Sequence, residues 1–208
     1  MSVIARLGLI IAAFAVQTAL LRAALPTHPD EAPSRASLAG QFLVAAPAMG
    51  DPRFERAVIL IVQDDPSGAL GIVVNKPIGE QPLAGLLEAL GDKNAVVAGS
   101  VRIFSGGPVQ PEAGFVLHSA EYRLPETLAI NDRLSLTSNV KILRDIANKS
   151  GPAKVLVAFG YAGWGPDQLD KEIDDGAWAT AESDPALVFD ADRDKLWDNL
   201  WERRTQHL

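Results

Sequence analysis

One stretch limits the fold more than any other: an apolar run, a glycine-rich turn and the start of a helix follow each other without interruption. Residues 155–159, V-L-V-A-F, form the apolar run, as expected for a strand that is buried on both faces. Glycines then stand at positions 160, 163 and 165, where they allow backbone conformations that are closed to other residues. The sequence therefore predicts a buried strand that turns sharply into a helix.

The residues after this turn carry the signals of a helix start. Pro166 suits the first helical position, because the N–H that it lacks has no partner there. Trp164 and Leu169 then have the spacing of a hydrophobic staple, and Gln168 stands where its side chain can reach back to the N-cap N–H. Gln168 and Glu172 share one helix face, which is interpreted as capping and a solvated surface. These features predict a rigid turn and name no reaction.

The composition excludes several classes of site. The chain has 208 residues, enough for one domain or for one domain with extensions. It contains no cysteine, which rules out disulfides, thiolate metal ligands and a cysteine nucleophile. The formal net charge is -7, and Lys and Arg are scattered, with Arg203 and Arg204 as the densest site. Tight binding to a phosphate backbone needs a basic face, so the sequence argues against a nucleic-acid partner.

The chain begins with an apolar segment, residues 1–25, followed by a proline-containing flexible linker, residues 26–37. The charge-free part, residues 7–21, is short for a bilayer span, which needs about 20 residues. Three interpretations stay open: a poor signal peptide or signal anchor, a helix that packs on the body or lies on a membrane surface, or an extension from an upstream start codon. A membrane contact is expected only through residues 4–25. We expect a cytoplasmic protein, with export or membrane anchoring as the alternative if this segment is a working signal.

The remaining residues, 38–208, are predicted to form one domain. Apolar and β-branched runs predict strands at residues 41–46, 57–62, 70–74, 101–104, 115–118, 134–137, 155–159, 178–181 and 187–189. Helices are predicted at residues 82–90, at 138–149 with Ser138 as the cap, and from Asp192 onwards. Helices are few and do not alternate regularly with the strands, which favours an α+β fold with a mostly antiparallel or mixed sheet.

Two loops between predicted strands carry strong turn chemistry. Residues 64–68, D-D-P-S-G, are a hairpin signal. Residues 105–109, S-G-G-P-V, could expose N–H groups to an anion, as glycine-rich turns do. They lack the Lys and Ser/Thr of a phosphate-binding loop and do not open a helix, so they are interpreted as a tight bend between two strands.

Polar residues at the ends of buried strands are the candidates for a site. His118 is interpreted as a hydrogen-bonded structural residue, or alternatively as a general base or a polar handle in a pocket. Asn75 follows a strand, where site residues often lie, although Asn before Lys-Pro is also good turn chemistry. No G-x-S-x-G elbow accompanies His118, and the acidic residues show no metal-ligand spacing. The sequence therefore predicts neither a metal site nor a catalytic residue.

Four blocks of sequence resemble the YqgE/AlgH family, a widespread bacterial family of uncharacterised proteins. The blocks are G-Q-F-L-V-A-A-P-A-M from Gly40, G-A-L-G-I-V-V-N from Gly68, G-G-P-V from Gly106 and G-W-G-P-D-Q-L from Gly163. Each block alone is weak, but four in the family's order are specific, and the resemblance covers residues 38–190. The apolar N-terminus departs from the family, which normally begins close to its first strand. Asp167 stands where the family usually has glycine, and we interpret it as support for a helix start rather than for a special backbone shape.

The resemblance implies a single compact α+β domain with a bent, barrel-like sheet, a few flanking helices and no established cofactor. One branch of the family takes its name from alginate regulation, and a role as a transcriptional regulator follows from that name alone. No helix-turn-helix pattern and no basic face support DNA contact. The resemblance implies no catalytic residue.

The leading hypothesis is a non-enzymatic binding or regulatory domain that acts through a small ligand or a protein partner. Its site is predicted where the loops after the strands converge, and the candidate ligand-binding residues are Asn75, His118, Trp164, Gln168 and Glu172. The alternative is a hydrolase-like or lyase-like enzyme that uses His118 as base with Glu172 or Asp51. An exposed His118 with a carboxylate in hydrogen-bond reach would favour the enzyme, and a buried His118 bonded to backbone would argue against it.

Overall fold

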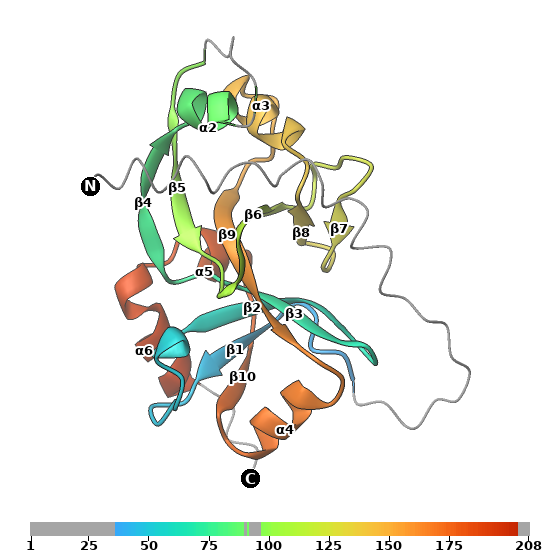
Figure 1. Ribbon diagram of the computed structural model, residues 1–208, viewed down its shortest axis with the longest axis vertical. Helices are drawn as coiled ribbons and strands as arrows, with labels where there is room; N and C mark the ends of the chain where they lie inside the picture. The colour runs from blue at the N-terminus through green and yellow to red at the C-terminus, as the bar shows by residue number, and fades with distance from the viewer. Residues whose placement is uncertain (1–35, 90, 92–96, 204–208) are drawn as a thin grey trace.

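The structure, a computed structural model, describes residues 36–89, 91 and 97–203. The described residues form an α+β domain in which ten strands make one strongly curled sheet and five α-helices lie on its surfaces (Figure 1). This confirms the expected fold class and the bent, barrel-like sheet. The apolar segment and the linker up to residue 35 lie outside the described residues. None of the described helices is long and apolar enough to cross a membrane.

The lower half of the sheet in Figure 1 is antiparallel throughout. Its strands, in spatial order, are β10 (Trp178–Glu182), β1 (Gln41–Ala45), β2 (Val58–Asp65) and β3 (Gly68–Val73). The predicted hairpin at residues 64–68 joins β2 to β3 and is confirmed. A short 3-10 helix, Pro52–Phe54, interrupts the connection from β1 to β2, and the Asp51 carboxylate caps it by accepting from the Arg53 N–H.

Strand β9 (Val155–Trp164) connects the two halves of the sheet, as Figure 1 shows. Its first residues lie between β5 (Ser100–Ser105), which is parallel to it, and β6 (Val109–Ser119), which is antiparallel. Its last three residues pair instead with β3. Gly160 lies at the change of partner with φ 75°, and a Cβ there would stand 2.3 Å from the Gly107 carbonyl oxygen. Only glycine fits this bend.

The upper half of the sheet continues on both sides of β5, β9 and β6. Beyond β6 lie β8 (Leu134–Thr137) and β7 (Leu128–Ala129), and beyond β5 lies β4 (Pro77–Pro82). Strand β4 has no counterpart among the predicted strands, because two prolines and a glycine give it low β-propensity. It is an edge strand, where prolines are tolerated.

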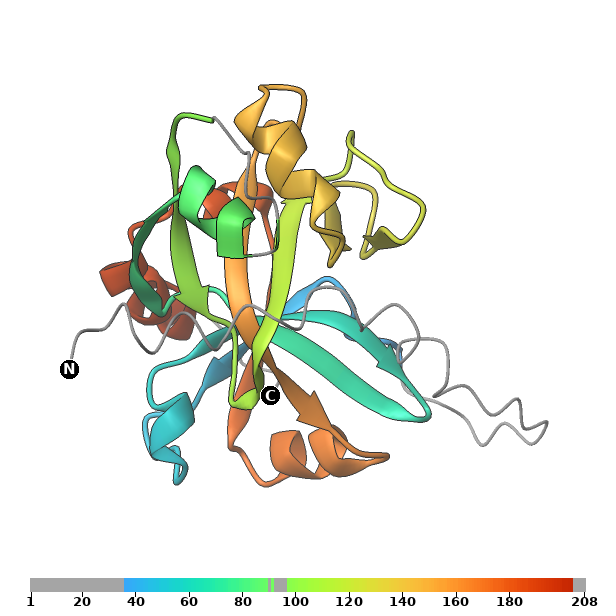
Figure 2. The same ribbon diagram turned by 45° about the horizontal axis from the view of Figure 1, so that its top comes forward.

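Alternating apolar residues give the sheet two buried faces. Phe42, Leu60 and Leu156 point into the curl, where α5 (Pro185–Phe189) and α6 (Arg193–Arg203) help to close the largest core cluster. Leu43 and Ile59 point outward beneath α4 (Gln168–Asp174). On the upper half, α2 (Leu83–Ala89) and α3 (Lys141–Ala147) cover the outer face, as Figure 2 shows with that end turned forward.

Two local expectations are wrong. Residues 187–189 belong to helix α5 rather than to a strand, because Pro185 opens a helical turn and the Asp184 carboxylate accepts from the Ala186 N–H at 2.8 Å. Helix α3 begins at Lys141, and Asn139, not Ser138, supplies the side-chain acceptor, for the Lys141 N–H at 2.9 Å. In both cases a short polar side chain next to an apolar run decides the local backbone.

Candidate functional site

Three of the predicted site residues meet at the turn after β9. The Glu172 Oε2 atom accepts from the indole Nε1 of Trp164 at 2.9 Å and from that of Trp178 at 2.8 Å, and its Oε1 atom accepts from Gln168 Nε2 at 2.8 Å. The two indole rings meet edge to face, with centroids 6.0 Å apart. We call Trp164, Gln168, Glu172 and Trp178 the indole–carboxylate cluster. Glu172 therefore lies inside a hydrogen-bonded cluster, so the interpretation of its side chain as part of a solvated face is wrong, whereas Gln168 is exposed as expected.

The start of α4 is capped partly as the sequence predicts. Gln168 Oε1 accepts from the Gly165 N–H at 3.0 Å, so the predicted reach of this side chain back over the turn is confirmed. The helix, however, begins at Gln168 rather than at Pro166, and Asp167 takes the left-handed conformation with φ 59°. The interpretation of Asp167 as a residue without a special backbone shape is wrong. Glycine adopts this conformation without steric cost, whereas an aspartate does so only with strain.

The cluster keeps Glu172 ionised. Burial acts to raise the pKa of this carboxyl, but hydrogen bonds from Trp178, Gln168 and Trp164 outweigh it and leave the pKa below its ordinary value. Both carboxylate oxygens are occupied by these donors. The charge is therefore used to hold two indoles in place.

His118 lies in β6 with no exposed surface. Its Nδ1 atom is 2.9 Å from the Ser119 carbonyl oxygen and its Nε2 atom is 2.9 Å from Thr137 Oγ1. Thr137 Oγ1 is 2.7 Å from Thr127 Oγ1, which accepts from the Leu124 N–H at 2.9 Å. Because a carbonyl only accepts, Nδ1 carries the proton and donates, and Nε2 accepts from Thr137.

This arrangement favours a neutral His118. Burial lowers the pKa of the imidazole, against smaller opposing contributions from the Ser119 carbonyl and from Glu121. Protonation of Nε2 would also reverse the direction of the Thr137 and Thr127 hydroxyl bonds. His118 is fully buried, and its two ring nitrogens bond to one backbone carbonyl and one threonine hydroxyl. These contacts fit the structural interpretation of the residue.

Asn75 connects two loops at the end of β3. Its Oδ1 atom accepts from the Val58 N–H at 2.8 Å, and its Nδ2 atom donates to the Arg56 carbonyl at 2.8 Å. Asn75 and Trp164 are at opposite ends of β3, because Trp164 pairs with Ala69 near the start of that strand. His118 pairs with Val155 at the start of β9, while Trp164 ends β9. The five candidate residues therefore do not share one cleft.

The glycine-rich loop between β5 and β6 packs against β9. The Gly106 N–H donates to the Phe159 carbonyl at 2.7 Å, and the Gly106 carbonyl accepts from the Val73 N–H at 2.8 Å. A Cβ on Gly107 would stand 2.1 Å from the backbone of Tyr161. These contacts fit the interpretation as a tight bend, and the Gly106 N–H is not available to an anion.

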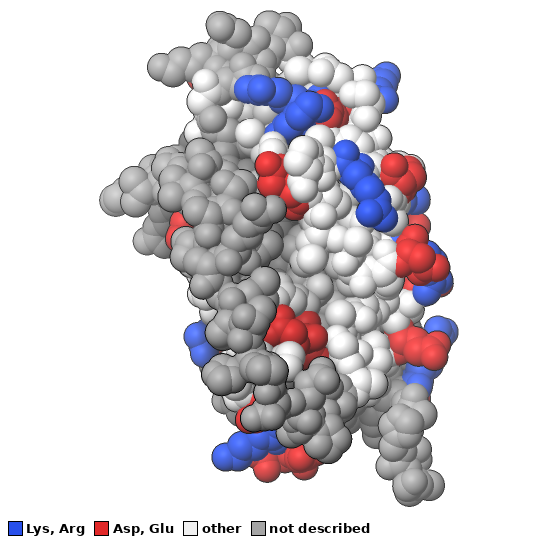
Figure 3. All heavy atoms as spheres, turned by 90° about the vertical axis from the view of Figure 1, so that its right-hand side faces the viewer, with Lys and Arg blue, Asp and Glu red and all other residues white. Residues whose placement is uncertain are grey.

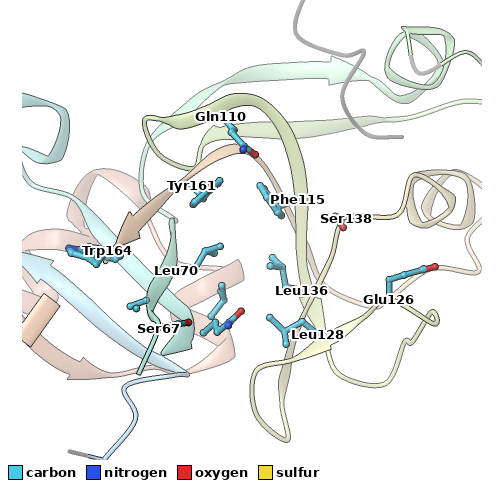
Figure 4. Close-up of a pocket in the computed structure, with 14 residues that line it drawn as sticks. Ser67, Leu70, Gln110, Phe115, Glu126, Leu128, Leu136, Ser138, Tyr161 and Trp164 are labelled. Carbon is cyan, nitrogen blue, oxygen red and sulfur yellow. The ribbon is translucent and has the colours of Figure 1, made fainter. Parts of the chain in front are cut away.

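A cavity of about 300 Å³ lies where the curled sheet opens, between the β2–β3 hairpin and strands β6 to β9. We call it the mouth cavity. Figure 4 shows Leu70 on one side and Phe115, Leu128 and Leu136 on the other. Its polar lining residues are Gln63, Ser67, Gln110, Glu126, Ser138 and Tyr161. Trp164 also lines it and is the one member of the predicted set that does.

Two irregularities in the sheet shape the mouth cavity. The register of β2 and β3 shifts between Ile61 and Gln63, so Val62 and Gln63 both line the cavity although neighbouring residues of a regular strand point to opposite faces. The register of β6 and β9 shifts after Val109, where Gln110 has φ 45°. Each irregularity places a glutamine at the cavity. Sequence periodicity could not find these residues, because the bulges break it.

The lining of the mouth cavity includes one charged residue, Glu126, whose Oε2 atom accepts from Asn139 Nδ2 at 2.9 Å. Figure 3 shows the side of the molecule that lies to the right in Figure 1. On the described part of this face, acidic and basic residues occur in small separate groups around an uncharged area. Among the described residues, no group of His, Asp and Glu has the arrangement to hold a metal ion.

Comparison with known proteins places the chain in a family. A family model described as AlgH-like matches residues 42–208. A UPF0301 protein of Cereibacter sphaeroides is 42% identical over 164 residues, which cover 78% of this chain and 89% of that protein. A UPF0301 protein of Bradyrhizobium diazoefficiens is 43% identical over 179 residues, covering 82% and 84% of the two chains.

Two solved structures have folds similar to this one. The solution structure of the AlgH protein from Pseudomonas aeruginosa superposes with a TM-score of 0.71 at 36% identity, over 84% of this chain and 92% of that one. A crystal structure of a protein from Corynebacterium diphtheriae has the same fold, with a TM-score of 0.63 at 21% identity, over 84% and 90% of the chains. The family match, the relatives and the shared fold agree with the four sequence blocks, and the chain belongs to the AlgH-like family.

Proposed function

We propose that this protein is a non-enzymatic binding domain that takes a small ligand, with an apolar body and a few hydrogen-bonding groups, in the mouth cavity. The observation that carries the proposal is the pair of sheet irregularities that direct Gln63 and Gln110 to the same cavity. Bulges beside a cavity typically re-aim a side chain for function, and a residue with positive φ that is not glycine costs free energy. A sheet that served only to build the fold would not need both register irregularities.

The walls of the cavity support an apolar ligand body. Val62, Phe115 and Leu136 line the cavity and also belong to the core cluster inside the curl, so the cavity reaches the protein interior. Ligand sites commonly occur in the mouths of curled sheets, with apolar walls and a few polar groups that orient the ligand. The volume of about 300 Å³ fits a small molecule better than a folded segment.

The indole–carboxylate cluster supports the proposal indirectly. Trp164 is 7% exposed and contributes one wall of the cavity, while its N–H is held by Glu172. The cluster fixes the orientation of this indole, and a fixed wall lowers the entropy that binding would otherwise cost. Gln168 and Glu172 thus act as positioning residues for Trp164 rather than as ligand contacts.

Two other hypotheses about function, an enzyme and a DNA-binding regulator, receive less support. The enzyme alternative needs His118 as a base, and that side chain is buried and bonded to the Ser119 carbonyl and Thr137. Regulation of transcription by direct DNA contact needs a basic face. On the described part of the one face that Figure 3 shows, Lys and Arg form no continuous patch, and the formal net charge of the chain is -7. The cytoplasmic location and the roles of residues 1–37 stay predictions.

Thermal unfolding of the full chain against a fragment and metabolite panel tests the proposal. A ligand present at 100 times its dissociation constant adds about 2.7 kcal/mol, which raises the melting temperature by roughly 5–11 °C for a domain of this size. The variant Ser138→Trp fills the cavity from its rim and should abolish the shift. Ser150→Trp, on an exposed loop outside the cavity, is the matched control and should keep it.

A shift that survives in Ser138→Trp would place the ligand elsewhere. A panel without any hit, in a protein that is folded by circular dichroism, would contradict small-ligand binding and leave a protein partner as the reading to test.

A further inference from the structure

A second cavity, of about 360 Å³, lies between strands β4, β5 and β9 and the connection from α5 to α6. It is separate from the mouth cavity, since the two share no lining residue. Its lining residues include two arginines, Arg102 and Arg193, and two acidic residues, Glu80 and Asp190. We call it the arginine cavity.

Arg193 is a buried cation without a carboxylate partner among the described residues. The residue is 9% exposed, its Nη1 donates to the Leu187 carbonyl at 3.1 Å, and its Nη2 donates to the Val188 carbonyl at 2.8 Å. The guanidinium also lies over the Phe104 ring, 5.4 Å from the centroid. These contacts cap the last carbonyls of α5 and use two of the five N–H donors of the group.

Arg102, in β5, also lines the cavity and is exposed. Among the described residues its guanidinium makes no hydrogen bond and no ion pair, although Glu80 stands opposite it in the β4–β5 register. Glu80 accepts instead from Ser100 Oγ, at 3.4 Å. The other carboxylate of the cavity, Asp190, is paired with Lys154 Nζ at 2.6 Å. Neither carboxylate is therefore bonded to either guanidinium.

Two guanidinium groups beside one cavity repel each other, and burial makes this repulsion stronger. Burial and the nearby Arg102 both lower the pKa of Arg193, with a smaller opposing effect from Asp190. A buried cation is normally paired, and the planar N–H edge of an arginine matches a carboxylate or phosphate with two parallel hydrogen bonds. An oxyanion in the cavity would satisfy the remaining donors of both residues.

We infer that the arginine cavity binds a small oxyanion, a carboxylate or a phosphate, between the guanidinium groups of Arg102 and Arg193. Arg193, held by the two carbonyls at the end of α5, supplies a fixed cation. Arg102, whose guanidinium has no hydrogen bond or ion pair within the described part of the chain, closes on the ligand from the sheet. This site does not depend on the mouth cavity, and either site can exist without the other.

NMR titration of the full chain with inorganic phosphate and, separately, with acetate tests the inference. The ¹H–¹⁵N signals of the Arg102 and Arg193 Nε groups should shift and saturate, and sodium chloride at matched ionic strength should not reproduce the saturating shift. Stronger saturation with phosphate or with acetate would identify which oxyanion the site prefers.

Variants of Arg102 make the test specific, because Arg193→Gln removes a buried cap and would confuse binding with folding. Arg102→Gln should weaken binding by about tenfold or more, since it removes one of two charged partners, and Arg102→Lys should lose less. Lys195→Gln, on the exposed face of α6, is the control and should bind as the wild type does. Shifts that follow ionic strength alone, or equal binding by Arg102→Gln, would overturn the inference.

Discussion

The two ends of strand β9 hold polar side chains in opposite ways. At its C-terminal end, Glu172 stays charged because two indoles and a carboxamide donate to it. At its N-terminal end, His118 stays neutral because its Nδ1–H has a carbonyl acceptor and its Nε2 accepts from a threonine. The direction of the available hydrogen bonds, and not burial alone, therefore decides which protonation state the fold stabilises at each end.

The largest loss of stability should follow from substitution of the charged Glu172, beside the C-terminal end of β9. Glu172→Leu leaves the N–H groups of Trp164 and Trp178 without their acceptor, and we expect a loss of about 2–4 kcal/mol in the free energy of unfolding. Urea denaturation measures this loss. Glu182→Leu, at an exposed position of β10, is the matched control and should change stability by less than about 0.5 kcal/mol. Equal effects of the two changes would contradict a structural role for the cluster.

Loss of a hydrogen-bonding group beside the neutral His118 should lower the free energy of unfolding somewhat less. Thr137→Val keeps the shape of the side chain but removes the hydroxyl between His118 and Thr127, and we expect a loss of about 1–3 kcal/mol in the same measurement. Thr180→Val in β10 provides the comparison, because Thr180 makes no side-chain hydrogen bond among the described residues. A Thr137→Val protein as stable as the wild type would show that the hydroxyl chain contributes nothing.

The contributions of His118 and Glu172 to the free energy of unfolding should be lost in two different pH ranges. Both groups have a pKa that is lower in the folded state than in the unfolded chain, so each contributes stability at high pH that is lost as the pH falls. For His118 the loss should begin below about pH 6.5, and for Glu172 below about pH 4.3, the ordinary values of the two side chains. Denaturation from pH 8 to pH 3 of the wild type, His118→Gln and Glu172→Gln measures both windows. A His118→Gln protein that loses as much stability as the wild type between about pH 6.5 and pH 5 would contradict the neutral state of His118.

The smallest change in stability is expected from substitutions of Asp167, in the turn that precedes α4. Asp167 has φ 59°, so Asp167→Gly should be neutral or stabilise the protein by up to about 1 kcal/mol, while Asp167→Ala should destabilise it by a similar amount. Differential scanning calorimetry resolves the sign. An Asp167→Gly protein less stable than Asp167→Ala would show that the left-handed conformation is not what matters here.

Much of the fold follows from periodicity and turn chemistry in the sequence. The hairpin at residues 64–68, the apolar run of β9 and the Gln168 cap are local features, and local features leave a signature in the order of residues. Strand β4 does not, because its pairing with β5 decides its backbone. Helix α5 does carry a local signal, the Asp184 cap before Pro185, but the apolar run at residues 187–189 predicts a strand. Local propensity alone disfavours a strand at β4 and favours a strand at residues 187–189 of α5.

Less of the candidate site could be predicted. Trp164 lines the mouth cavity as a candidate residue, but Gln63 and Gln110 reach it only because two bulges shift the strand registers. The two arginines of the second cavity come from β5 and α6, which are far apart in the sequence. Predicting such convergence requires the curl of the sheet, which arises from long-range pairing rather than from any single segment.

¹H–¹⁵N NMR mapping of a panel hit on the full chain would show where the ligand binds. For a ligand in the mouth cavity we expect saturating shifts concentrated at the side-chain amides of Gln63 and Gln110 and at the Trp164 indole, with Asn75 and His118 unchanged. Ser138→Trp should remove these shifts and Ser150→Trp should keep them. Saturating shifts at Asn75 or His118, with the mouth cavity silent, would contradict the claim that ligand binding belongs to the mouth of the curled sheet.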